Sequence, residues 1–298
     1  AYCAALGIEV IPEIDVPGHN QVLAAAYPEF FCFPKPDMNV RTTAGNSKEL
    51  VCPQKPEVWK FYASVFNELK DIFPSGIVHL GGDEAPTEVW EKCPLCREAR
   101  TKTGMKDEQE QMRAFFAKTT VLLAKNGQTP QFWYEGNAGI YHPGETVYAW
   151  RQDQALQSIE KTKKAGLNLI MASNEYCYLD FPQIQGQRNW GWMKTTTLQK
   201  CYELDPAFGK PEKEAGHIRG VHAPVWAERL PDLDHLLYRA YPRACAIAEA
   251  GWSPMSVRSW ENFRRKLADH RQFILKRFNY DMKRTQGNEP AFRWENNK

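Results

Sequence analysis

The stretch that most constrains the fold is Ile77–Glu84, with the sequence IVHLGGDE. Its apolar first half is typical of a strand that is buried on both faces, as in parallel sheets. Two glycines then break the strand, and two adjacent carboxylates follow. In parallel α/β folds the reacting groups lie at the carboxyl ends of the strands, and neighbouring acids can push their pKa values apart. The same acids could instead cap the N-terminus of the next helix. The residues at the other strand ends are therefore needed to distinguish a helix cap from a catalytic site.

Further segments have the length and apolarity of strands, and each ends in or is followed by polar or aromatic residues: Ile8–Asp15, Gln131–Glu135, Thr146–Trp150, Leu167–Ala172 and Gly220–Val225. They alternate with segments of helical periodicity: Ala1–Leu6, Glu57–Phe73, Thr87–Thr103, Glu108–Lys125, Gln154–Ala165, Leu233–Ala250 and Ser259–Phe278. This alternation predicts a parallel α/β sheet. No glycine-rich phosphate-binding motif follows a strand, which favours a TIM-type (β/α) barrel over a nucleotide-binding fold.

Composition and charge narrow the function. The 298 residues are 43% hydrophobic, enough for one large domain or two. A net charge of +2 argues against nucleic acid or an anionic membrane as partner. No apolar run approaches the ~20 residues that span a bilayer. The irregular segment Tyr27–Pro53 is long for a loop inside a compact domain, so we expect it to be functional.

The eight cysteines leave three alternatives open. Cys93 and Cys96 form one Cys-x-x-Cys pair, and a single pair does not specify zinc. Cys32 and Cys52 bracket the long loop and could complete a four-sulfur zinc site or form a disulfide with each other. Free thiols are the third alternative.

Several motifs together resemble one known family. They are HLGGDE at 79–84, PEIDVPGH at 12–19, Trp133, Trp150, YLD at 178–180 and WAE at 226–228. In this order and spacing they are similar to the family 20 glycoside hydrolases, the β-N-acetylhexosaminidases. The resemblance covers roughly residues 1–280 and implies the removal of terminal β-linked GlcNAc or GalNAc from glycans, without a cofactor.

The resemblance implies retaining hydrolysis in which the substrate supplies the nucleophile, unlike the usual second carboxylate. The 2-acetamido oxygen of the sugar would attack the anomeric carbon and form an oxazolinium ion. Glu84 would be the general acid and base. Asp83 would hold the acetamido N–H, and Tyr178 would fix the acetamido oxygen.

The same resemblance gives roles to further residues. The walls of the sugar pocket would be formed by Trp133, Trp150 and Trp226. Hydrogen bonds from sugar hydroxyls would be accepted by Asp180 and Glu228. His19 would lie behind the general acid and tune its proton. Supporting residues would be His79, Asp15, Glu135 and Arg151. Taken alone, each tryptophan is more often a core residue, and His79 a buried structural residue.

The sequence departs from the family pattern in one respect. The family barrel has eight strands, whereas this sequence shows the third to the eighth, in a barrel domain over 1–282 followed by a tail over 283–298. We expect that the upstream part exists in the natural protein, and that the isolated chain has impaired activity. Self-association across the uncovered barrel edge is a further expectation.

Two rival functions use the same scaffold. One is a non-catalytic protein that binds N-acetyl sugars, and the other is a barrel hydrolase with Asp83 as nucleophile. The adjacency of Asp83 and Glu84 argues against the second rival, since neighbours in sequence do not easily flank one glycosidic bond, whereas the first rival stays open. Because the expected substrates are N-acetylhexosamine-terminated oligosaccharides or glycoconjugates, we expect a periplasmic or secreted location.

Overall fold

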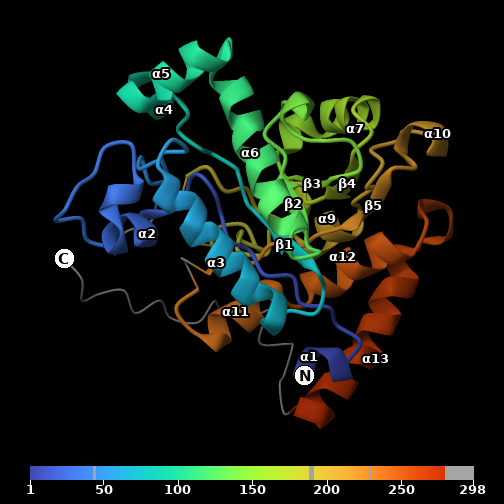
Figure 1. Ribbon diagram of the computed structural model, residues 1–298. Helices are drawn as coiled ribbons and strands as arrows, with labels where there is room; N and C mark the ends of the chain where they lie inside the picture. The colour runs from blue at the N-terminus through green and yellow to red at the C-terminus, as the bar shows by residue number, and fades with distance from the viewer. Residues whose placement is uncertain (43–44, 188–190, 228–229, 279–298) are drawn as a thin grey trace. The chain divides into compact units, whose positions relative to one another are not determined.

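The computed structural model describes residues 1–42, 45–187, 191–227 and 230–278, which fall into two compact units (Figure 1). The first unit comprises Ala1–Tyr148 and Glu160–Asn168, and the second comprises Ala149–Ile159 and the chain from Leu169 onward. The expected tail over 283–298 lies outside the described residues.

The first unit contains a parallel sheet in sequence order. Strands β1 (Ile77–His79), β2 (Thr129–Trp133) and β3 (Thr146–Ala149) pair as neighbours. Helices α3 (Pro56–Ile72) and α6 (Glu108–Ala124) lie side by side (Figure 1), and α6 packs on β2. Buried rings of the two helices and of β2 form the core: Tyr62, Phe66, Phe115, Phe116 and Phe132.

The segment expected as a strand over Ile8–Asp15 pairs only at its end. Pro12 accepts from the backbone N–H of His79, and a single parallel bridge joins Glu13 to His79. The backbone N–H of Ile8 instead donates to Cys3, at the end of helix α1 (Tyr2–Ala5). Because Ile8 completes the preceding helical turn, the predicted strand is wrong for its first half.

The helix expected over Thr87–Thr103 is two helices, α4 (Glu88–Lys92) and α5 (Pro94–Thr103). Cys93 separates them in an extended conformation, with φ −71° and ψ 121°. Pro94 is the cause, because its ring disfavours helical backbone at the preceding residue while suiting the first position of a new helix.

The second unit also has a parallel pair, β4 (Asn168–Met171) and β5 (Ile218–Val221). Strand β5 begins two residues before the expected Gly220. The helix expected over Leu233–Ala250 is broken at Pro242 into α11 (Leu233–Ala240) and α12 (Arg243–Trp252). The core of this unit combines α9 (Leu198–Tyr202), α12 and α13 (Trp260–Phe278), through side chains such as Cys201, Tyr202, Ile247 and Phe263.

The remaining helices are short, apart from α7, and close the connections: α2 (Gln21–Ala26), α7 (Ala155–Lys164), α8 (Asn174–Cys177) and α10 (Glu212–Ala215). Isolated 3₁₀ turns occur at Pro28–Phe30, Ala138–Ile140, Gln152–Gln154 and Met255–Val257. Among the described residues, no helix combines the length and the apolarity needed to cross a bilayer.

Candidate active site

The turn after β1 depends on its two glycines. Gly81 and Gly82 have φ of +60° and +92°, which residues with a Cβ rarely adopt. A Cβ at Gly81 would lie 2.2 Å from the carboxyl carbon of Asp15, and one at Gly82 would lie 2.6 Å from Phe116. Only glycine therefore allows the backbone to pass between Asp15 and the core and to deliver Asp83 and Glu84.

Asp15 holds this turn from the neighbouring segment. Its Oδ1 accepts a hydrogen bond from the backbone N–H of Gly82 at 3.0 Å. Burial raises the pKa of Asp15 well above its usual value, and the nearby Asp83 carboxylate adds to the effect. The role expected for Asp15, as support behind the acids, agrees with these contacts.

His19 lies between the two acids. Its Nε2 is 3.6 Å from Asp83 Oδ2 and 3.6 Å from Glu84 Oε2. The close contact with the Asp83 carboxylate is the main reason that the pKa of His19 is raised to about 9, so the ring is a cation at neutral pH. His19 and Glu84 have φ of +50° and +48°, and such backbone strain in residues with side chains is concentrated at functional sites.

The two acids differ in their surroundings. The Asp83 side chain is 14% exposed, and its buried Oδ1 has no hydrogen-bond partner among the described residues. The Glu84 side chain is 30% exposed, and its Oε2 accepts a hydrogen bond from Asn46 Nδ2 of the long loop. One carboxylate thus offers a buried acceptor atom, while the other faces solvent and can exchange protons.

A group of aromatic side chains packs around the end of β1, the strand that precedes the two acids. Glu13 Oε1 accepts from Trp133 Nε1 at 2.9 Å and lies 3.3 Å from His79 Nδ1. The His79 ring packs edge-on against Tyr148 and Trp133, with centroids 4.8 and 5.1 Å apart. His79 is buried, as expected for a supporting residue, and Trp133 is almost fully enclosed.

Glu13 and Tyr148 are functional candidates that the sequence analysis missed. Glu13 precedes Asp15 by two positions, so an extended segment places both on one face, and this spacing was the available signal. Glu135, expected in the same supporting role, is half-buried, and its backbone N–H donates to Tyr141 Oη at 3.3 Å.

The second unit brings together three predicted sugar-binding aromatics. The Tyr178 ring stacks on Trp150 with centroids 6.4 Å apart, and Trp226 lies 6.1 Å from Tyr178. The Arg151 guanidinium lies 4.0 Å above the Trp150 ring. Aromatic faces of this kind are suited to cover the apolar face of a sugar or an acetamido methyl.

Arg243 holds the loop that carries Tyr178 and Asp180. It is fully buried and donates to the backbone oxygens of Leu179 and Thr196, at 2.5 and 2.9 Å. Burial lowers the pKa of Arg243 to about 10, so it remains charged at neutral pH. Asp180 is buried in this loop. The apolar helical pattern around Arg243 gave no sign of this role.

The roles expected for the site residues stay predictions. Glu228 lies outside the described residues. Asp83 belongs to the first unit and Tyr178 to the second, so their joint grip on one N-acetyl group stays a prediction.

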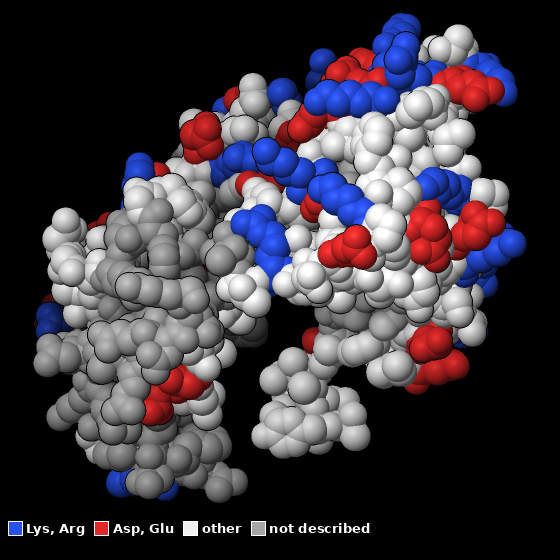
Figure 2. Space-filling view, turned by 90° about the vertical axis from the view of Figure 1, so that its left-hand side faces the viewer, with Lys and Arg blue, Asp and Glu red and all other residues white. Residues whose placement is uncertain are grey.

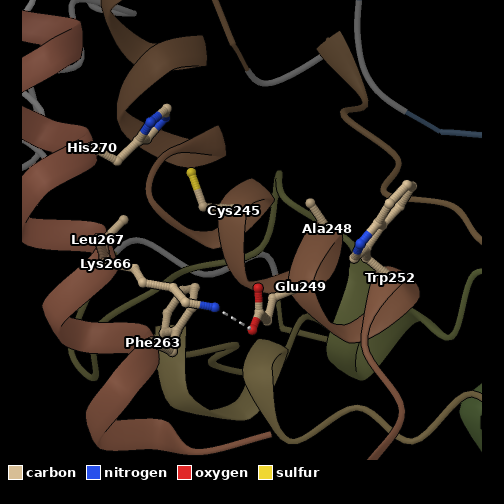
Figure 3. A pocket seen from close by; sticks show the side chains of 8 residues that line it. All are labelled: Cys245, Ala248, Glu249, Trp252, Phe263, Lys266, Leu267 and His270. Carbon is tan, nitrogen blue, oxygen red and sulfur yellow. Dashed lines mark hydrogen bonds and ion pairs between the residues drawn. The ribbon is translucent and has the colours of Figure 1, made fainter. Parts of the chain in front are cut away.

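A groove between α12 and α13 is a separate feature of the second unit (Figure 3). Its lining is mainly apolar, with the exposed Trp252 at one end. Its carboxylate, Glu249, is paired with Lys266 at 3.4 Å. None of the predicted site residues that the structure describes lines this groove.

The four cysteines singled out as metal candidates converge in the first unit. Cys32, Cys52, Cys93 and Cys96 are buried, and their sulfurs all lie within 4.8 Å of one another. Asp15, His19 and Asp83 are the other described group at such distances, and their contacts are those of the acidic turn.

Comparisons with known proteins agree with this chemistry. Residues 1–255 match the description "Glycosyl hydrolase family 20, catalytic domain". The chain is 94% identical to a β-hexosaminidase of Akkermansia muciniphila, over all of this chain and 60% of that protein.

Solved structures give the same picture. A β-N-acetylhexosaminidase crystal structure superimposes with a TM-score of 0.96 at 94% identity, over 99% of this chain and 63% of that one. The family 20 β-N-acetylhexosaminidase of Streptomyces coelicolor A3(2) is 29% identical, with a TM-score of 0.74 over 90% of this chain and 51% of that one. These likenesses confirm the predicted (β/α) barrel class.

Proposed function

Because the chain belongs to glycosyl hydrolase family 20, we propose that the protein removes terminal β-linked N-acetylhexosamine from glycans by substrate-assisted catalysis. The observation that carries the proposal is the buried, unpartnered Oδ1 of Asp83 next to the solvent-facing Glu84. Since the chain spans 60% of the Akkermansia relative, the activity is proposed for the whole protein.

The first step forms the oxazolinium ion. The protonated Glu84 carboxyl gives its proton to the glycosidic oxygen while the acetamido oxygen of the sugar forms a bond to the anomeric carbon. The leaving group departs with the electron pair of the broken bond. Asp83 Oδ1 accepts the acetamido N–H, so its negative charge stabilises the positive charge that develops on that group.

The second step returns the enzyme to its starting state. Glu84, now ionised, removes a proton from a water molecule that attacks the anomeric carbon from the side vacated by the leaving group. The oxazoline ring opens and the sugar keeps its original configuration, as in a double displacement. Because Glu84 is partly exposed, water can reach it.

The cation at His19 fits this cycle. At 3.6 Å from both carboxylates, its positive charge attracts the negative charge of Asp83 and, after proton transfer, that of Glu84. Trp150, Tyr178 and Trp226 would enclose the N-acetyl sugar, with Tyr178 Oη donating to the acetamido oxygen. Asp180 and Glu228 would accept hydrogen bonds from sugar hydroxyls.

The substrate would be an oligosaccharide or glycoconjugate that ends in GlcNAc or GalNAc, and the reaction would need no cofactor. Such polymers support an extracytoplasmic location for the protein. Self-association stays a prediction.

The test compares Glu84→Gln and Asp83→Asn with the wild type on a chromogenic β-N-acetylglucosaminide. We expect both to lower kcat by about 10²-fold or more, while the matched glucoside, which lacks the acetamido group, is not cleaved by any of the three. Wild-type cleavage of the glucoside, or a trapped sugar ester on Asp83, would favour an enzymic nucleophile instead. A wild type that binds N-acetylglucosamine without cleaving the substrate would be a sugar-binding protein.

A further inference from the structure

The described residues place four cysteines from three segments at one point of the first unit. Cys32 and Cys52 lie at the two ends of the long loop, Cys93 lies between α4 and α5, and Cys96 lies in the first turn of α5. We propose that these four residues bind one Zn²⁺ as thiolates, in a structural site that joins the long loop to α4 and α5.

The distances between the sulfurs fit a tetrahedron around a metal. Cys96 Sγ lies 3.8 Å from Cys32 Sγ and 3.7 Å from Cys52 Sγ. A tetrahedral zinc–thiolate site with bonds of about 2.3 Å has sulfurs about 3.8 Å apart. A disulfide needs about 2.05 Å and joins only two sulfurs, so it would leave the other two cysteines of the cluster unexplained.

Helix α5 shows why this point needs a strong link. Its sequence is PLCREARTKT, and Cys96 is its only buried residue. Charged side chains of both signs gather at the top of the face in Figure 2, the level at which α4 and α5 lie in Figure 1. Helices are normally held by the burial of an apolar face, and α5 has none. A metal bound through Cys96 and Cys93 supplies the missing attachment.

The loop is attached at the same point. A single antiparallel bridge joins Phe31 to Val51, and the backbone N–H groups of Cys32 and Cys52 donate to Leu50 and Phe30. Between the two cysteines the loop is mostly exposed. One bridge is too little strand pairing to be stable by itself, and two sulfur ligands on one metal would hold the two ends of the loop together.

The surroundings of the sulfurs suit thiolates. Cys96 lies at the positive end of the α5 dipole. All four residues are buried, so water does not compete for a coordination position.

These features specify the kind of metal. Four thiolates favour a soft or borderline ion in tetrahedral geometry, which selects Zn²⁺ over Mg²⁺ or Ca²⁺. With four protein ligands the site is closed, so the ion has a structural role. Binding releases the thiol protons.

The direct test is the metal content of the full-length protein, purified without added metal and measured by elemental mass spectrometry. We expect about one zinc per chain in the wild type. Cys96→Ala should lose it, whereas Cys201→Ala should keep it, because Cys201 is equally buried but lies outside the cluster. Replacement of zinc by Co²⁺ should give the visible absorption of a tetrahedral thiolate complex.

A second pair of variants shows whether zinc is lost because a ligand is removed or because Cys96→Ala misfolds. Cys32→His should retain about one zinc, since three cysteines and one histidine also bind it, whereas Cys32→Ala should lose it. Three results would overturn the proposal: a metal-free wild type with its thiols free, a wild type with a disulfide within the cluster by mass, or equal zinc in Cys96→Ala and Cys201→Ala. None of these readouts depends on hydrolase activity.

Discussion

The acidic turn after β1 and the closed end of the long loop are both fixed points of the first unit, but different forces hold them. At the turn, the backbone passes so close to Asp15 that a Cβ on Gly81 would lie 2.2 Å from its carboxyl carbon, and the backbone N–H of Gly82 donates a hydrogen bond to the same side chain. At the loop, the attachment that we propose is made by the side chains of four cysteines. The turn is thus possible because its glycines have no Cβ, whereas the loop would be held by a metal ion that its cysteines bind.

This difference separates two kinds of failure. A change at the turn displaces Asp83 and Glu84 themselves. Among the described residues, the loop contacts the acids through Asn46, which donates to Glu84. Effects on stability and rate should therefore be largest at the turn and smallest along the loop.

The largest effect is expected for Gly81→Ala. The new Cβ would lie within 2.2–2.6 Å of the Asp15 carboxylate, at a φ of +60°. We expect a loss of about 3 kcal/mol or more in the free energy of unfolding, from overlap and backbone strain together, measured by urea denaturation.

Gly104→Ala is the matched control. Gly104 has a φ of +71°, and a Cβ there would have nothing within 4 Å. Backbone strain alone should then cost about 1 kcal/mol. Equal losses in the two variants would mean that contact with Asp15 does not shape the turn.

An intermediate effect is expected from the charge of His19. Its pKa is about 9 in the folded protein, above the value near 6.5 of an unperturbed histidine. Its contribution to stability is therefore complete below about pH 6.5 and is lost as the pH rises through 9.

Between these pH values the free energy of unfolding should fall by about 1 kcal/mol more in the wild type than in His19→Gln, after allowance for partial exposure. His270→Gln, which removes an exposed histidine on α13, should behave as the wild type. If the free energy of unfolding of His19→Gln fell as much as that of the wild type over this pH range, the decline would come from groups other than His19.

The smallest effect is expected for Asn46→Ala. Loss of one hydrogen bond to a carboxylate should lower kcat about 3- to 10-fold with little change in KM. Asn39→Ala, an exposed asparagine of the same loop, should leave the kinetics unchanged. If Asn46→Ala matched Glu84→Gln in its effect, the loop would be as direct a part of the chemistry as the turn.

The sequence predicted the turn better than it predicted its supports. The motif at 77–84 specified strand, glycines and acids because all three are local. Asn46 and Arg243 act through partners far along the chain, so no local pattern marked them. Pro94 and Pro242 interrupt regions of helical periodicity, and periodicity alone joined the helices on either side.

The cysteine cluster was predicted less fully than the turn but better than its supporting residues. Their spacing raised a four-sulfur site as one of three alternatives. Their convergence depends on the path of a long irregular loop, which propensity does not determine.

The central claim is that the sugar brings its own nucleophile and that Asp83 and Tyr178 aim it. The most direct measurement is a crystal structure of the full-length protein with a thiazoline mimic of the oxazolinium ion. We predict Asp83 Oδ1 within about 3.2 Å of the thiazoline nitrogen, with Tyr178 Oη directed at the sulfur that replaces the acetamido oxygen. A thiazoline that binds with Asp83 or Tyr178 beyond hydrogen-bond reach of that ring would contradict the account.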